Sequence, residues 1–126
     1  MKKLPFSKKQ LEEIVKKYPT PFHLYDEKGI RDNAQRLKKA FSWAPGFKEY
    51  FAVKANPNPH LIKILQEEGF GVDCSSLTEL CLVEKVGLKA EEIFFSSNDT
   101  PLKEYQKALD LGALINLDDF THLKFL

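Results

Sequence analysis

The sequence predicts an α/β fold made of four consecutive strand–helix units. Short apolar segments alternate with amphipathic segments of helical length, and each strand–helix pair takes about twenty residues, as expected for units of a parallel sheet. A closed (β/α)8 barrel needs roughly 250 residues, so a chain of 126 residues supplies about half of one. We therefore expect a partial (β/α)8 barrel of about four units, preceded by a helix and a short strand.

The N-terminal region is predicted to hold two helices and one short strand. Ser7 is expected to cap a first helix that ends at Tyr18, where two prolines follow. Residues 22–25 are expected to form the strand. A second amphipathic helix is predicted over 27–41, and a loop that contains tryptophan, proline and glycine follows over 42–47.

The region from residue 47 onward is predicted to contain the barrel units. The expected strands are 50–53, 70–73, 93–95 and 113–115, and the helices that follow them are 59–68, 77–86, 102–111 and a last one from Asp118 onward. Strands that alternate with helices in this way run parallel, with right-handed crossovers. We accordingly divide the chain into residues 1–46, which lead into the barrel, and residues 47–126, which hold the first units of a truncated barrel.

The composition is that of an ordinary globular chain, 43% hydrophobic with a formal net charge of +1. No apolar run is long enough for a membrane helix, and Lys2 and Lys3 are not followed by the apolar stretch of a signal peptide. These features predict a cytoplasmic protein that does not enter a membrane. Cys74 and Cys81 have neither metal-site nor disulfide-framework spacing, so we expect two reduced thiols.

Several classes of ligand find no support in the sequence. Paired lysines such as Lys16 and Lys17 alternate with apolar residues, which is typical of the solvated face of a helix and not of a surface that binds nucleic acid. His23, His60 and His122 are too dispersed to predict a metal site. The glycines lack the spacing that cradles a phosphate. We expect neither a nucleic acid nor a metal as a ligand.

Lys54 is the most informative single residue. It follows the apolar strand that begins at Tyr50, and the chain then breaks into an Asn/Pro loop that reaches Pro59. Catalytic groups of α/β barrels lie at the carboxyl ends of the strands. A lysine whose surroundings lower its pKa can condense with an aldehyde, which makes Lys54 a candidate for binding pyridoxal phosphate. The alternative is a solvated lysine that merely ends a strand.

Polar side chains follow the other three strands as well. They are Asp73, Cys74, Ser75, Ser76, Ser96, Ser97, Asn98, Asn116 and Asp118. The carboxyl ends of parallel strands share one rim, so a lysine, a carboxylate and several hydrogen-bonding groups are expected to face one cavity. The competing interpretation is that serine, asparagine and aspartate here are helix caps, Asp118 above all, and that Glu79 only complements a helix dipole.

These segments resemble the N-terminal part of the fold-type III pyridoxal-phosphate-dependent decarboxylases, and among them diaminopimelate decarboxylase. The resemblance rests on residues 20–26 with the helix after them, on 50–59 and on 71–80, and it continues through 93–98 and 115–118. It implies an alanine-racemase-like barrel, preceded by a strand that belongs to a second, β-rich domain. It also implies pyridoxal 5'-phosphate (PLP) as cofactor, an amino acid as the small-molecule substrate, and a homodimer for the complete enzyme.

The resemblance also implies roles for individual residues. Lys54 would form the internal aldimine with PLP, and Asp73 would be the acidic residue beside the cofactor and its lysine. Ala52 and Ser75 fall at cofactor-binding positions of the family, and so do Lys54 and Asp73. Glu79 matches a position that is often acidic in the family. The implied reaction is loss of carbon dioxide from meso-diaminopimelate to give L-lysine, a step of lysine biosynthesis.

The sequence departs from the diaminopimelate enzymes in two respects. They usually carry Asp-Val-Ala-Ser-Gly-Gly-Glu-Leu where this chain has Asp-Cys-Ser-Ser-Leu-Thr-Glu-Leu over residues 73–80, a form closer to the ornithine-type relatives. The chain also stops before the family's ring-stacking histidine, glycine-rich phosphate loop and pyridine-pairing acid, so we expect it to be inactive alone. Decarboxylation of ornithine, arginine or carboxynorspermidine, an amino-acid racemase, and a non-catalytic half-barrel that binds a partner remain open.

Overall fold

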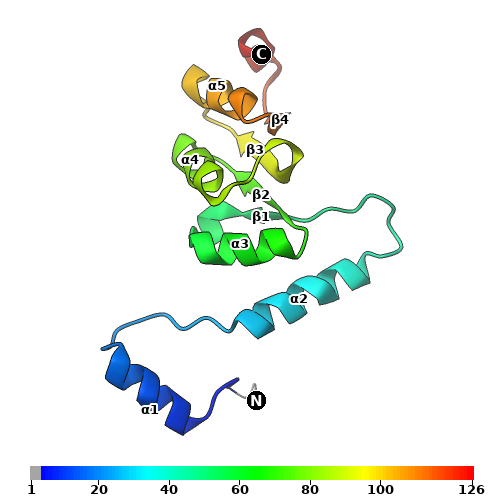
Figure 1. Cartoon of the computed structure of the whole chain (residues 1–126). Helices are drawn as coiled ribbons and strands as arrows, with labels where there is room; N and C mark the ends of the chain where they lie inside the picture. The colour runs from blue at the N-terminus through cyan, green and yellow to red at the C-terminus, as the bar shows by residue number, and fades with distance from the viewer. Residues whose placement is uncertain (1–3) are drawn as a thin grey trace.

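The computed structural model describes residues 4–126, and a four-stranded parallel sheet forms its centre (Figure 1). The strands are β1 (Tyr50–Ala52), β2 (Gly71–Cys74), β3 (Ile93–Ser97) and β4 (Leu114–Leu117), and they lie side by side in chain order. Every neighbouring pair is parallel. Sequential order with a helix between successive strands is the topology of an opened β/α barrel, so the fold-class prediction is confirmed.

Within residues 4–126, five α-helices accompany the sheet. They are α1 (Lys8–Lys17), α2 (Glu27–Ala40), α3 (Pro59–Glu67), α4 (Leu77–Val86) and α5 (Leu102–Asp110). Serine hydroxyls cap two of them as expected. Ser7 forms a reciprocal capping box with Gln10 at the start of α1, and Ser76 accepts a hydrogen bond from the Glu79 amide at the start of α4.

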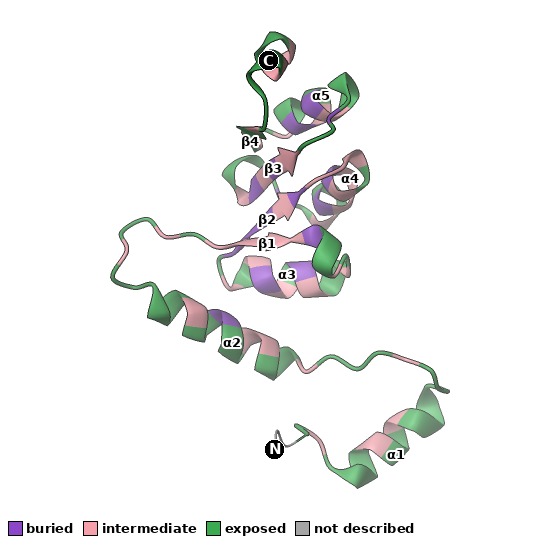
Figure 2. Cartoon of the chain, turned by 180° about the vertical axis from the view of Figure 1, so that it is seen from behind, coloured by how far each residue is buried: buried purple, intermediate pink, exposed green. Residues whose placement is uncertain are grey.

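One face of the sheet is covered by α3, α4 and α5. Val72 and Cys74 of β2 and Ile93 and Phe95 of β3 are almost completely buried there. They belong to one core cluster with side chains from all three helices, which are Ile62, Leu80, Val83, Tyr105 and Ala108. Because side chains alternate along a strand, the residues between them occupy the opposite face, the inner face of the barrel. In Figure 2, purple marks buried residues in the sheet and in helices α3, α4 and α5.

The N-terminal helices stand apart from this core. None of the residues of α1 is buried, and α1 lies away from the sheet in Figures 1 and 2. Helix α2 packs on the outer side of α3, where Ala34 shares a small apolar cluster with Leu65 and Phe70. No helix in residues 4–126 combines the length and the apolar character that crossing a membrane requires.

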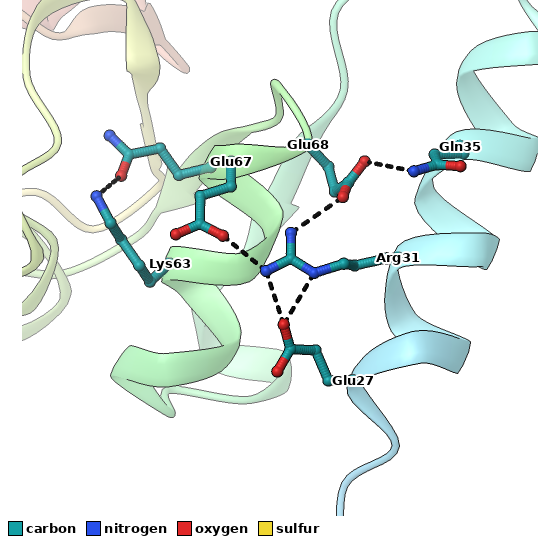
Figure 3. A network of polar contacts seen from close by, with 7 residues as sticks. Glu27, Arg31, Gln35, Lys63, Glu67 and Glu68 are labelled. Carbon is teal, nitrogen blue, oxygen red and sulfur yellow. Dashed lines mark hydrogen bonds and ion pairs between the residues drawn. The ribbon is translucent and has the colours of Figure 1, made fainter. Parts of the chain in front are cut away.

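A polar network also joins α2 to α3 (Figure 3). The guanidinium of Arg31 contacts three carboxylates, those of Glu27 at 2.8 Å, Glu67 at 2.6 Å and Glu68 at 3.0 Å. Gln35 donates a second hydrogen bond to Glu68. The bonds from Arg31 and Gln35 hold the pKa of Glu68 below its ordinary value. The network therefore fixes α2 on the barrel by charge as well as by apolar contact.

The expected strand at residues 22–25 is wrong. This segment has no regular secondary structure, because no other segment among the described residues pairs with it. The apolar alternation of Phe22 to Tyr25 predicts a strand only where a partner strand completes the ladder.

The structure corrects several boundaries as well: β2 spans 71–74 instead of 70–73, β4 spans 114–117 instead of 113–115, and β3 continues to Ser97. Strand β1 ends at Ala52, one residue earlier than expected, and Val53–Ala55 form a 3₁₀ turn. The last predicted helix is also a 3₁₀ helix, over Phe120–Phe125. Asp119, and not Asp118, caps it by accepting a hydrogen bond from the Thr121 amide at 2.7 Å. Asp118 is thus free of the capping role that the sequence suggested.

Candidate active site

The carboxyl ends of the strands converge on one polar pocket. The pocket has a volume of about 290 Å³ and is lined by Lys54, Ser75, Ser96, Ser97, Asn98 and Asp118. These residues follow or end β1, β2, β3 and β4 in turn. The sequence prediction that a lysine and several hydrogen-bonding groups face one cavity is therefore confirmed for these six side chains.

Lys54 is held in place by its neighbours and not by an ion pair. Val53, directly before it, is fully buried, and the Asn56 amide closes the turn with a hydrogen bond of 3.1 Å to the Val53 carbonyl. Asn58 then caps α3 by accepting from the His60 amide at 2.9 Å. Lys54 itself is exposed, and no carboxylate in residues 4–126 forms a salt bridge with it. Its amine is accessible from the pocket.

Asp73 lies on the inner face of β2, next to β1, the strand that leads to Lys54. It is the register partner of Ala52. Its carboxylate oxygen Oδ1 accepts a hydrogen bond of 2.7 Å from the Ser96 hydroxyl of β3. Asp73 and Ala52 are not among the residues that line the pocket, so Ser96 is the side chain through which Asp73 connects to it.

Glu79 shapes the loop that follows β2. Its Oε2 accepts a hydrogen bond of 2.6 Å from the Ser75 amide and one of 3.3 Å from the Ser75 hydroxyl. The Ser76 hydroxyl in turn accepts from the Glu79 amide. These contacts fix the position of Ser75 at the rim. The alternative that Glu79 only complements the dipole of α4 does not account for these bonds.

Cys74 takes no part in the pocket. It points to the helices and is completely buried. Burial, with smaller contributions from the nearby carboxylates of Glu79 and Asp73, raises the pKa of the Cys74 thiol to about 12. The thiol is therefore protonated at neutral pH and unsuited to act as a nucleophile.

Two aromatic rings lie on the inner face toward the amino ends of the strands. Tyr50 of β1 and Phe94 of β3 have ring centroids 5.5 Å apart, and the Tyr50 hydroxyl donates to the Glu91 carbonyl at 2.8 Å. The Tyr50 ring crosses over Gly71, where an added Cβ would lie 2.5 Å from two ring carbons. The glycine is needed for this close approach and not for a phosphate cradle.

The chemistry of the pocket fits the aldehyde end of a cofactor such as PLP. It offers the accessible amine of Lys54, the carboxylate of Asp118, and hydroxyl and amide groups that can bind polar atoms, and the carboxylate of Asp73 is hydrogen-bonded to one of those hydroxyls. Among the described residues the lining includes no glycine. These residues fit the part of a cofactor site that meets the aldehyde, and not a glycine-rich phosphate cradle.

The chain matches a family model described as "Pyridoxal-dependent decarboxylase, pyridoxal binding domain" over residues 27–126. It is 46% identical over 114 residues to Protein TabA of Pseudomonas amygdali pv. tabaci, covering 90% of this chain and 27% of TabA. It is 38% identical over 112 residues to diaminopimelate decarboxylase of Methanothermobacter thermautotrophicus, covering 88% of this chain and 26% of that protein. The chain thus spans about a quarter of the length of these curated relatives.

Solved structures agree with this match. Diaminopimelate decarboxylase from Helicobacter pylori, complexed with L-lysine, superimposes with a TM-score of 0.79 at 34% identity, over 91% of this chain and 29% of that one. Ornithine decarboxylase from Entamoeba histolytica gives a TM-score of 0.76 at 30% identity, over 93% of this chain and 37% of that one. The chain belongs to the pyridoxal-dependent decarboxylase family, and its residues 27–126 match the family's pyridoxal-binding domain.

Proposed function

We propose that this chain is the N-terminal part of a PLP-dependent decarboxylase that converts meso-diaminopimelate to L-lysine and carbon dioxide. The observation that carries the proposal is the accessible amine of Lys54, at the strand-end pocket of a pyridoxal-binding barrel. When bound, PLP supplies the ring that accepts the electrons left when the substrate's carboxylate departs.

Each residue of the site has a role in this proposal. Lys54 would hold the cofactor covalently through Nζ, at its aldehyde carbon. Asp73 would supply a carboxylate on the inner face, on the strand next to the one that leads to Lys54, and would help to orient the cofactor. Ser75, fixed by Glu79, and Ala52, level with Asp73, would contact the cofactor.

The choice of diaminopimelate is supported by the relatives. Curated diaminopimelate decarboxylases from several organisms are more than 30% identical to this chain over most of its length. The ornithine-type form of residues 73–80 supports a second candidate, an ornithine or arginine decarboxylase. In either case we propose a cytoplasmic homodimer, in which residues 1–46 lead into the barrel and residues 47–126 begin it.

The experiment is a product assay on the complete protein from its natural source. Purified protein is incubated with PLP and, separately, with meso-diaminopimelate, ornithine and arginine, and each product is identified by mass spectrometry. The proposal predicts L-lysine from meso-diaminopimelate as the main product. Putrescine from ornithine as the main product would favour the second candidate over the diaminopimelate enzyme. If none of the three amino acids is decarboxylated, both candidate functions are contradicted.

A pair of lysine variants ties the activity to the site. Lys54→Ala should abolish product formation, because the cofactor loses its covalent anchor. Lys103→Ala is the matched control, since Lys103 is an exposed lysine of α5 outside the pocket. Equal activity of the two variants would contradict the role of Lys54.

A further inference from the structure

We propose that Ser96 is a positioning residue for the Lys54 site, acting through the carboxylate of Asp73. The inference rests on the proposed function and adds to it a residue of β3. In β3 the buried Ile93 and Phe95 point to the helices, so Phe94 and Ser96 point to the inner face. Ser96 is the first polar inner-face residue of this strand, and its hydroxyl reaches across to β2.

The contact leaves one oxygen of Asp73 for a ligand. Oδ1 is bound by the Ser96 hydroxyl at 2.7 Å, whereas Oδ2 has no hydrogen bond within residues 4–126. In the same residues no buried side-chain oxygen or nitrogen lacks a hydrogen-bond partner. Since Oδ2 has no partner, it must be accessible to solvent. Ser96 therefore holds Asp73 by one oxygen and leaves the other available.

Ser96 connects Asp73 to the pocket. Ser96 lines the pocket together with Lys54 and Ser75, whereas Asp73 does not. Without the hydroxyl, half-buried Asp73 would have no hydrogen-bond partner for Oδ1. Its charge would then no longer be fixed relative to the amine of Lys54. A fixed charge favours the bound cofactor because no reorganisation is needed on binding.

The test compares serine variants of the complete protein. Ser96→Ala should weaken PLP binding to the apo protein, measured by absorbance titration, roughly tenfold, the size expected for one hydrogen bond to a charged group. It should also lower kcat with little change in KM. Ser96→Thr keeps the hydroxyl and should restore both values. Ser42→Ala is the matched control, since Ser42 is an exposed serine outside the pocket whose hydroxyl bonds no other described residue.

A double variant shows whether the effect passes through Asp73. In an Asp73→Asn background, Ser96→Ala should cause little further loss of PLP affinity, because the charge that Ser96 positions is already gone. Full additivity of the two changes, or a Ser96→Thr protein that behaves like Ser96→Ala, would overturn the inference. If the wild-type protein binds PLP through Lys54 while Ser96→Ala equals wild type, only this inference fails. If the wild-type protein binds no PLP, the proposed function fails.

Discussion

Replacing Gly71 by alanine tests the packing on the inner face most sharply. A Cβ at this position would lie 2.5 Å from two carbons of the Tyr50 ring and 2.8 Å from the Glu92 carbonyl oxygen. All three distances are shorter than a carbon atom tolerates. The Tyr50 ring is held between the Glu91 carbonyl and Phe94, and the Glu92 oxygen belongs to the backbone. Neither neighbour can move without breaking a contact.

We therefore expect Gly71→Ala to destabilise the protein by about 3 kcal/mol, the upper end of the usual cost of overpacking. Gly87→Ala is the matched control. Gly87 ends α4 with φ of +100° and has open space around its Cβ position, so alanine there meets backbone strain without a clash. That strain costs about 1 kcal/mol.

The assay is thermal unfolding of the complete protein, followed by circular dichroism and by cofactor absorbance. Gly71→Ala should lower Tm clearly more than Gly87→Ala does. Gly71 lies two residues before Asp73 on the same strand. Gly71→Ala should therefore also weaken PLP binding, whereas Gly87→Ala should not. Equal Tm values for the two variants would refute the packing argument.

Three further predictions concern the polar network and the buried thiol. Arg31→Gln should lower Tm more than Lys28→Gln, because the second change removes only one exposed ion pair of the same helix. The difference in Tm between the two variants should become smaller in about 1 M salt. A difference that does not depend on salt would contradict the electrostatic account. The pKa of Glu68 lies below its ordinary value of 4.5 in the folded state, so its contribution to stability is present above that pH and is lost as the pH falls below it. In Glu68→Gln, Tm should therefore decrease less between neutral pH and about pH 3 than in the wild-type protein. An equal decrease in the two proteins would contradict this role of Glu68. Cys74 should resist iodoacetamide at about pH 8 in the folded protein and react once it is denatured, as peptide mass spectrometry can show.

The elements that the sequence predicted well are those set by local pattern. The four strand–helix units follow from the alternation of apolar strands with amphipathic helices, and the start of α4 after Ser76 follows from a serine cap. The wrong predictions concern features that depend on residues outside the segment itself. A strand at 22–25 needs a pairing partner, and the choice between an α-helix and a 3₁₀ helix after Asp119 depends on how a short terminal segment packs.

The site divides in the same way. Convergence of Lys54 and Ser75 could be predicted because parallel strands end on one edge of a sheet. The bond between Asp73 and Ser96 could not, because it depends on the register between β2 and β3. The need for Gly71 likewise follows from the Tyr50 ring on a neighbouring strand, which no local pattern reveals.

The most direct test of the account is reduction of the complete protein with borohydride, followed by peptide mass spectrometry. The account predicts a pyridoxyl group on Nζ of Lys54 and on no other lysine of residues 4–126. Complete recovery of the unmodified Lys54 peptide from protein saturated with PLP, or modification at another lysine instead, would contradict it.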